Sequence, residues 1–175
     1  RRNPRYVSGS LVIEISSNIK FKKSDIGESV CCDGVCLTLI RIKKKSFLFY
    51  LSKETLKRSN FKYAKIGKFI NIEKSLLNGQ KISGHYVQGH VDSTAKIKKI
   101  SIVDKTWIIR LELKDRELNK YLIEKASISI NGVSLTISKV AKGFFEINVI
   151  PHTLKLTNLK NLSSKDIVNV ELDIF

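Results

Sequence analysis

Two histidines lie in one stretch of the chain, Gly84-His85-Tyr86-Val87-Gln88-Gly89-His90-Val91, and each directly follows a glycine. Histidine is the side chain best suited to move protons near neutral pH, so this stretch is a candidate for acid–base chemistry. Glycine lets the backbone approach a flat ligand closely. A strand bulge with hydrogen-bonded histidines explains the same residues equally well. The residues alone leave both interpretations open.

A repeated motif supplies the next candidates. The segment Asp33-Gly34-Val35-Cys36-Leu37-Thr38 returns 98 residues later as Asn131-Gly132-Val133-Ser134-Leu135-Thr136. Other residues recur at the same offset, namely Thr55-Leu56-Lys57 as Thr153-Leu154-Lys155, Asn60 as Asn158, Asn71 as Asn169, and Glu73 as Glu171. Several anchors at one ungapped offset indicate a duplication, and the period is far too long for a solenoid. We therefore expect two copies of a small domain, residues 1–97 and 98–175.

The repeated motifs differ in one reactive residue, which is Cys36 in the first copy and Ser134 in the second. A thiol of lowered pKa can act as a nucleophile or transfer a proton, whereas a serine hydroxyl needs an adjacent base. Most free cysteines are simply small buried apolar residues, and that interpretation of Cys36 also stays open. The stretch from Gly84 to Val91 has no counterpart at the offset, so it is a second difference between the copies.

Both copies have the pattern of β structure. The Asp-Gly and Asn-Gly pairs are typical of tight hairpin turns between short runs rich in β-branched residues. The expected strands are 29–32, 35–40, 46–51 and 69–73, with counterparts at 127–130, 133–138, 144–150 and 167–172. Helical pattern is limited to turns after Thr55 and Thr153 and to Lys114–Lys125. Short strands at regular spacing predict an all-β protein made of two similar barrels.

The formal net charge is +16, which raises the hypothesis of a barrel that binds nucleic acid. The lysines are scattered, however, with no arginine-rich stretch and few interleaved aromatic residues, and this favours an ordinary solvated surface. No apolar run approaches the roughly 18 residues of a membrane span. The N-terminus lacks the apolar core of a signal peptide. We therefore expect a soluble cytoplasmic protein with no nucleic-acid or membrane partner.

The three cysteines, Cys31, Cys32 and Cys36, are odd in number and form no CxxC pair. Vicinal cysteines rarely bridge each other because the short loop strains disulfide geometry. A reducing compartment fits this usage. No second Cys/His pair stands nearby at zinc-ligand spacing, so we expect no metal site.

Taken together, these segments resemble the riboflavin synthase family over essentially the whole chain. The matching segments are Asp33 to Thr38, Lys53 to Leu56, Gly84 to Val91, Asn131 to Thr136, Ile150 to Leu154 and Val168 to Asp173. The resemblance implies two six-stranded Greek-key barrels, each binding one 6,7-dimethyl-8-ribityllumazine. It further implies that one lumazine donates four carbons to the other, without a cofactor, to give riboflavin and a ribitylamino-pyrimidinedione. A homotrimer with active sites between subunits, and association with lumazine synthase, are also implied.

The resemblance also carries site residues. Those expected to take part in the chemistry are Cys36, His90, Ser134 and Asp173, supported by His85 and Lys125. The expected substrate-binding residues are Ser29, Cys36, Leu37, Thr38, Tyr50, Leu51, Ser52, Lys53, Glu54, Thr55, Gly89, His90, Val91, Lys125, Ser134, Leu135, Thr136, Ile150, Pro151, His152, Thr153, Leu154 and Lys155. His90 is expected to deprotonate the acidic 7-methyl group of one lumazine. Cys36, Ser134 or water supplies the nucleophile for the other, and Asp173 orients the Ser134 hydroxyl.

Three departures from the family pattern stand out. Asn131 replaces the usual aspartate, which preserves the turn but removes an acid. The family's opening Met-Phe-Thr-Gly-Ile and its C-terminal trimerisation helix are not found, so we expect a truncated first strand and a weakened trimer. The main alternative function is a non-catalytic antenna protein that binds lumazine or flavin. Such proteins have generally lost the cysteine that Cys36 matches.

Overall fold

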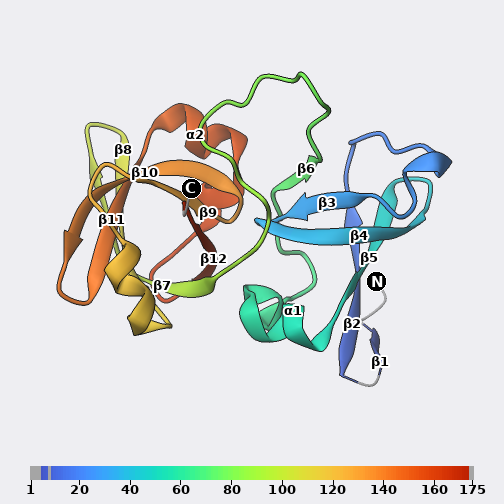
Figure 1. Cartoon of the computed structure of the whole chain (residues 1–175), viewed down its shortest axis with the longest axis horizontal. Coiled ribbons are helices and arrows are strands. Elements are labelled where there is room, and N and C mark those ends of the chain that lie inside the picture. The colour runs from blue at the N-terminus through green and yellow to red at the C-terminus, as the bar shows by residue number, and fades with distance from the viewer. Residues whose placement is uncertain (1–4, 8, 174–175) are drawn as a thin grey trace.

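The computed structural model describes residues 5–7 and 9–173, and it places two β-rich halves side by side (Figure 1). The first half is a six-stranded sheet in the order β1-β2-β5-β4-β3-β6. Its strands are β1 Arg5–Val7, β2 Ser10–Ser16, β3 Ser29–Cys32, β4 Val35–Ile42, β5 Ser46–Leu51 and β6 Ile72–Lys74. The second half is a closed barrel in the order β10-β11-β8-β7-β12-β9. Its strands are β7 Ser93–Val103, β8 Thr106–Leu113, β9 Ser127–Ile130, β10 Val133–Ala141, β11 Phe144–Val149 and β12 Ile167–Leu172.

The elements confirm the duplication. Strands β3 and β5, and helix α1 (Lys53–Arg58), recur 98 residues later as β9, β11 and helix α2 (Pro151–Leu156). Short 3-10 helices η2 (Asn60–Tyr63) and η4 (Asn158–Asn161) follow the two α-helices. The pairing of β4 with β5 shifts register between Leu39 and Arg41, and the pairing of β10 with β11 shifts at the equivalent place. Both copies therefore share their irregularities as well as their regular structure.

The two predicted hairpin turns form as expected. Asp33 and Gly34 have φ angles of 47° and 76°, and Asn131 and Gly132 have 48° and 81°. Two consecutive left-handed residues define the turn that suits the twist of a two-residue hairpin, and Asp-Gly and Asn-Gly pairs adopt it readily. The turns join β3 to β4 and β9 to β10 in register, with Cys32 opposite Val35 in the first copy.

The first sheet is open, whereas two closed barrels were expected. In the second half, β12 pairs both with β9 and with the start of β7, from Ser93 to Lys96. Within the described residues, strand β6 pairs with β3 and with no other strand, and it begins at Ile72, three residues later than the expected Phe69. The predicted boundary at residue 97 falls inside β7, and a boundary before Ser93 keeps that strand with its partners.

Helical structure is sparse, as the sequence predicts. The expected helical segment Lys114–Lys125 is shorter, forming the 3-10 helix η3 (Arg116–Tyr121), and η1 (Lys23–Asp25) occupies a similar place in the first half. Among the residues that the structure describes, no helix has the length and apolar character that would let it cross a membrane.

Each half has its own apolar core, because alternate residues of its strands point inward. Phe49 and Leu39 are fully buried in the first half, and Phe145 and Ile137 fill the second. On the opposite face, Cys36 and Thr38 of β4 and Tyr50 of β5 are exposed, whereas Ser129 of β9 and Glu171 of β12 are buried. The exposed face of β4 and β5 is therefore a surface that can receive a ligand.

The halves meet through their turns and through a symmetric set of asparagines. The main-chain N–H of Asn60 donates to Oδ1 of Asn169 at 2.6 Å, and that of Asn158 donates to Oδ1 of Asn71 at 2.7 Å. A Cβ placed on Gly34 would lie 2.6 Å from the main-chain nitrogen of Gly132. The duplicated sequence thus builds an approximately twofold contact between the two copies.

Candidate functional site

The outer face of the first sheet carries a row of polar and aromatic side chains. Ser29 on β3 lies opposite Thr38 on β4, and Thr38 lies opposite Tyr50 on β5. Cys36 lies two residues before Thr38, so strand alternation places it on the same face. Cys36, Thr38 and Tyr50 are all exposed, and the Tyr50 hydroxyl donates to Oγ of Ser10 at 2.7 Å. This face combines hydroxyl groups, a thiol and an aromatic ring.

The second barrel repeats this row with changed residues. Ser127 lies opposite Thr136, and Ser129 lies opposite both Ser134 and Glu171. Ser134 is equivalent to Cys36, as the sequence predicts, because each pairs with the equivalent residue of the preceding strand. The thiol of the first face is thus replaced by a hydroxyl on the second.

The Gly-His stretch contacts one residue of each row, Ser134 on the second barrel and Cys36 on the first sheet. Nδ1 of His85 is 2.7 Å from Oγ of Ser134, and the main-chain N–H of His85 also donates to this oxygen at 3.3 Å. A side chain at Gly84 would collide with Ser134. Nε2 of His85 is buried without a hydrogen-bond partner among the described residues. One histidine is therefore anchored on the second barrel by the predicted serine.

The same stretch reaches the first sheet at Gly89. The main-chain N–H of Cys36 donates to the carbonyl of Gly89 at 2.8 Å. Gly89 has φ of 79°, and an added Cβ would lie 2.9 Å from the Cys36 nitrogen, so both the backbone angle and the close approach require glycine. His90 follows with its side chain exposed. The structure thus brings together Cys36 and the segment that carries His90.

Glu171 holds this segment from the second barrel. Its carboxylate accepts the main-chain N–H groups of Gln88 at 2.7 Å, Gly89 at 2.8 Å and His90 at 3.1 Å. In the sequence, Glu171 belongs to the repeat and to the segment Val168 to Asp173 that matches the family, and no role was predicted for it. Its recurrence with Glu73 was the available signal, but nothing in the spacing indicated a contact with the Gly-His stretch.

The three cysteines have different environments. Burial, and secondarily the negative charge of Glu73, raises the pKa of Cys31 to about 12. Burial also raises the pKa of Cys32 well above its ordinary value. Cys36 is the exposed thiol, which removes the interpretation of it as a buried core residue. Of the three, Cys36 is the thiol that a ligand on the outer face can meet.

The remaining predicted residues lie around these faces. Ser52 caps α1 by accepting the N–H of Thr55 at 3.1 Å, so the segment from Tyr50 to Thr55 joins the end of β5 to the helix. The segment from Ile150 to Lys155 occupies the equivalent place and includes α2. Leu37, Leu51 and Leu154 are buried, so their side chains support the faces from within.

The predicted site residues also include Lys125, Val91 and Asp173, which lie in three different segments of the chain. Lys125 is exposed in the turn before β9, with φ of 69°, and Val91 is half-buried beside the first core. Asp173 follows β12 and is half-buried. The Ser134 hydroxyl bonds to His85, and no hydrogen bond to Asp173 joins it within the described part of the chain.

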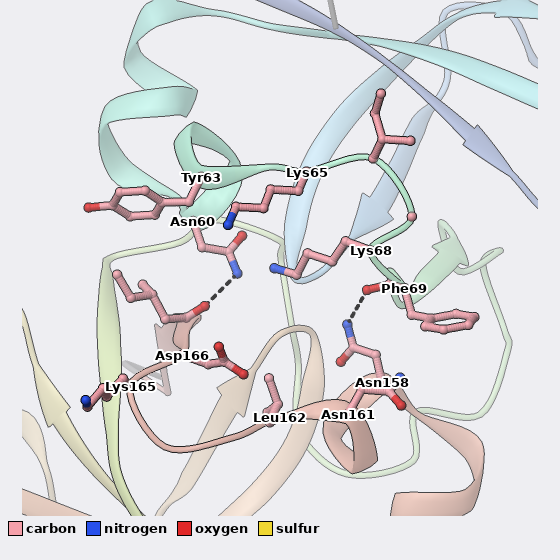
Figure 2. Close-up of a pocket in the computed structure, with 13 residues that line it drawn as sticks. Asn60, Tyr63, Lys65, Lys68, Phe69, Asn158, Asn161, Leu162, Lys165 and Asp166 are labelled. Atoms are coloured by element: carbon pink, nitrogen blue, oxygen red, sulfur yellow. Dashed lines mark hydrogen bonds between the residues drawn. The ribbon is translucent and has the colours of Figure 1, made fainter. Parts of the chain in front are cut away.

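The contact between the halves also forms a cavity of about 490 Å³ that the sequence did not indicate (Figure 2). Its walls come from equivalent segments, with Asn60 and Phe69 facing Asn158 and Ile167. Figure 2 shows the side-chain amide of Asn158 donating a hydrogen bond to the carbonyl of Phe69. The side chain of Lys68 extends into the cavity. The described residues contain no cluster of three or more His, Cys, Asp or Glu that suits a metal ion.

Comparison with known proteins agrees with this architecture. The family model of the lumazine binding domain matches twice, at residues 3–75 and 88–173. Riboflavin synthase of Buchnera aphidicola subsp. Schizaphis graminum is 38% identical over 159 residues, which are 91% of this chain and 76% of the relative. Riboflavin synthase of Escherichia coli K12 is 36% identical over 151 residues, covering 85% and 70% of the two chains.

Solved structures share the fold. The crystal structure of LumP complexed with riboflavin has a TM-score of 0.84 to this chain, at 21% identity, and covers 98% of this chain and 93% of that one. LumP complexed with 6,7-dimethyl-8-(1'-D-ribityl) lumazine gives a TM-score of 0.82 at 20% identity, with coverage of 97% and 92%. The sequence relatives and the two matches of the domain model together show that the chain belongs to the riboflavin synthase family of enzymes.

Proposed function

We propose that this protein converts two molecules of 6,7-dimethyl-8-ribityllumazine into riboflavin and 5-amino-6-(D-ribitylamino)uracil by transfer of four carbons. The observation that carries the proposal is the outer-face row that occurs twice, with Cys36 in one copy and Ser134 in the other. Two equivalent faces suit two identical substrates. Their difference suits a reaction in which one substrate donates carbons and the other receives them.

Binding uses the groups on each face. The Tyr50 ring gives an apolar surface for the lumazine on the first sheet, and the hydroxyls of Ser29 and Thr38 bond to its ribityl chain. On the second barrel Thr136 takes the equivalent role, with the start of α2 beside it. His85, whose Nδ1 lies 2.7 Å from the hydroxyl oxygen of Ser134, holds this serine beside the second lumazine. A few polar groups around an apolar contact are typical of such sites.

The chemistry begins with loss of a proton from the 7-methyl group of one lumazine, whose carbanion is delocalised into the ring. His90 is the base in this proposal, because it is exposed beside the main chain of Cys36. Cys36, Ser134 or water then adds to the ring carbon that carries the 7-methyl group of the other lumazine. Holding the two rings together supplies much of the rate acceleration.

We also propose that the active site forms between subunits of a cytoplasmic homotrimer, in which the first sheet of one subunit meets the second barrel of its neighbour. The exposure of Cys36, Thr38 and Tyr50 supports this, since a single chain leaves their face uncovered. Association with lumazine synthase, which would deliver the substrate, belongs to the same proposal. Analytical ultracentrifugation with and without lumazine tests the assembly, and full activity in a monomer would contradict it.

A second candidate function is an antenna that binds lumazine or flavin without reaction. The fold shared with LumP favours it, because LumP was solved in complexes with lumazine and riboflavin. The presence of Cys36 and of a complete second barrel favours the enzyme. Both functions require lumazine binding. They differ in whether the bound lumazine is converted to riboflavin.

The decisive experiment is incubation of the protein with 6,7-dimethyl-8-ribityllumazine while riboflavin fluorescence and the pyrimidinedione product are followed. We expect both products to appear in equal amounts, from two lumazines consumed. Bound lumazine that stays unreacted would establish the antenna function. Absence of binding would leave the nucleic-acid hypothesis, which titration with labelled single-stranded RNA then tests.

A further inference from the structure

Glu171 of the second barrel accepts hydrogen bonds from the main chain of the Gly-His stretch at three consecutive residues. The carboxylate is buried, with 6% of its surface exposed, and it accepts three consecutive N–H groups from Gln88, Gly89 and His90. No lysine or arginine lies within ion-pair distance of Glu171 in the described part of the chain. Its charge is therefore balanced by main-chain dipoles, in the way that a backbone nest binds an anion.

Gly89 connects Glu171 to the first sheet through a second hydrogen bond. Gly89, whose N–H is held by Glu171, accepts the N–H of Cys36 through its own carbonyl. The path from Glu171 to Cys36 thus consists of two short hydrogen bonds through one residue, and that residue has no room for a side chain. His90, the next residue, is held by the same carboxylate oxygen as Gly89. The positions of His90 and Cys36 relative to each other therefore depend on Glu171.

The equivalent residue of the first copy does not share this role. Glu73 lies on β6 and is exposed, and burial of part of its surface raises the pKa of its carboxyl. No hydrogen bond from a main-chain N–H reaches its carboxylate within residues 9–173. Glu73 and Glu171 are therefore equivalent in the repeat but have different roles. The reason is that the stretch from Gly84 to Val91, which Glu171 binds, has no counterpart in the repeat.

We propose that Glu171 is a positioning residue for the reaction, which fixes His90 against Cys36 by holding the main chain of residues 88–90. This inference rests on the proposed function. A positioned base and its partner gain from orientation, and misplacement by about 1 Å can cost on the order of 10²-fold in rate. Glu171 itself need not touch the substrate.

The test is Glu171→Gln, which keeps the size of the side chain but replaces one acceptor oxygen by an NH₂ group. Both carboxylate oxygens face main-chain N–H groups, so either orientation of the amide places donor against donor. We expect kcat to fall roughly 10- to 100-fold, while direct binding of lumazine changes less than about threefold. The amides of residues 88–90 should also exchange their hydrogens faster, which is measured without any turnover. Glu171→Asp, which keeps the charge, should recover part of the rate.

The matched control is Asp166→Asn, because Asp166 accepts the main-chain N–H of Ser163 at 2.8 Å just before the same strand begins. It should leave kcat and the exchange at residues 88–90 unchanged. In a His90→Ala background, Glu171→Gln should lower kcat by less than about twofold, because a shared role makes the two changes non-additive. Fully additive effects, or a wild-type kcat in Glu171→Gln, would overturn the positioning role. If the wild-type protein forms no riboflavin from lumazine, the proposed function is refuted instead. If amide exchange at residues 88–90 is unchanged in Glu171→Gln, the hydrogen bonds from Glu171 do not hold this segment in place.

Discussion

Asn71 and Asn169 stand at equivalent positions of the two halves and make mirrored hydrogen bonds across the contact between them. The amide of Asn71 donates to the carbonyl of Asn131 at 2.9 Å, and that of Asn169 donates to the carbonyl of Asp33 at 2.8 Å. Each side chain also accepts a main-chain N–H at the start of a 3-10 helix in the other half. The duplication therefore gives two equivalent sets of hydrogen bonds between the halves, and in each set one half donates while the other accepts.

Loss of one of these asparagines should destabilise the whole molecule. Asn169→Ala leaves the N–H of Asn60 and the carbonyl of Asp33 without their partners in a buried place. We expect the free energy of unfolding to fall by about 2–4 kcal/mol, because each unsatisfied buried group costs about 1–3 kcal/mol. Urea unfolding measures the change. Asn78→Ala, in an exposed loop, is the control and should have almost no effect.

The turns at the contact give a second test of the packing. Gly34→Ala places a Cβ 2.6 Å from the backbone of Gly132, whereas Gly67→Ala meets nothing within 4 Å. Both glycines have positive φ, so the backbone strain of about 1 kcal/mol is common to the two variants. Gly34→Ala should therefore be less stable than Gly67→Ala by roughly 1–3 kcal/mol, the cost of forcing atoms into a packed interface. Equal unfolding midpoints would show that the halves separate readily.

Asp33 makes the same contact dependent on pH. Burial raises the pKa of its carboxyl to about 6, although hydrogen bonds from the Asn71 main chain and the Asn158 amide, and the charge of Lys68, act in the opposite direction. A folded-state pKa above the ordinary value of 3.8 means that the folded protein holds this proton more tightly than the unfolded chain does. Stability from this group is therefore complete below about pH 4 and is lost as pH rises to about 6.

Asp33→Asn should consequently stabilise the protein at neutral pH. The amide keeps the oxygen that accepts from Asn71 and Asn158, and Asn131 already occupies the equivalent turn. We expect a gain on the order of 1–3 kcal/mol at pH 7.5 and little difference at pH 4, measured by urea unfolding at both values. A variant that is less stable than wild type at pH 7.5 would show that the charge is favourable there.

Local patterns predicted the strands best where they were bounded by strong turn signals. Asp33-Gly34 and Asn131-Gly132 fixed the ends of β3 and β9 to the residue, because such turns depend on only a few neighbouring residues. The start of β6 was placed three residues early, since strand pairing with another part of the chain decides it. The grip of Glu171 on residues 88–90 depends on contacts between segments more than 80 residues apart, which no local spacing encodes.

The exposure of Cys36 predicts selective chemistry at that thiol. Iodoacetamide reacts with the thiolate, and the raised pKa of Cys31 and Cys32 keeps both protonated near neutral pH. In the folded protein Cys36 should be alkylated first, by at least about tenfold in rate, as followed by peptide mass spectrometry. Saturating 6,7-dimethyl-8-ribityllumazine should slow the labelling if Cys36 lies in the substrate site. Labelling that is indifferent to lumazine would place the ligand elsewhere.

Kinetics separate the residues proposed for chemistry from those proposed for binding. The donor and the acceptor lumazine play different parts, so the asymmetry must come from residues that differ between the copies, above all Cys36 against Ser134 and the unrepeated His90. Cys36→Ala and His90→Ala should each lower turnover by roughly 10²-fold or more, as expected for a lost nucleophile or base. Lumazine binding should weaken much less, since the ring and ribityl contacts remain.

Thr136→Ala should instead weaken binding with a smaller effect on turnover. Single-turnover rates at saturating lumazine, beside direct binding, measure the two effects separately. If Cys36→Ala reacts at the wild-type rate, its thiol only packs against the substrate, and the chemistry falls to Ser134, His90 and water.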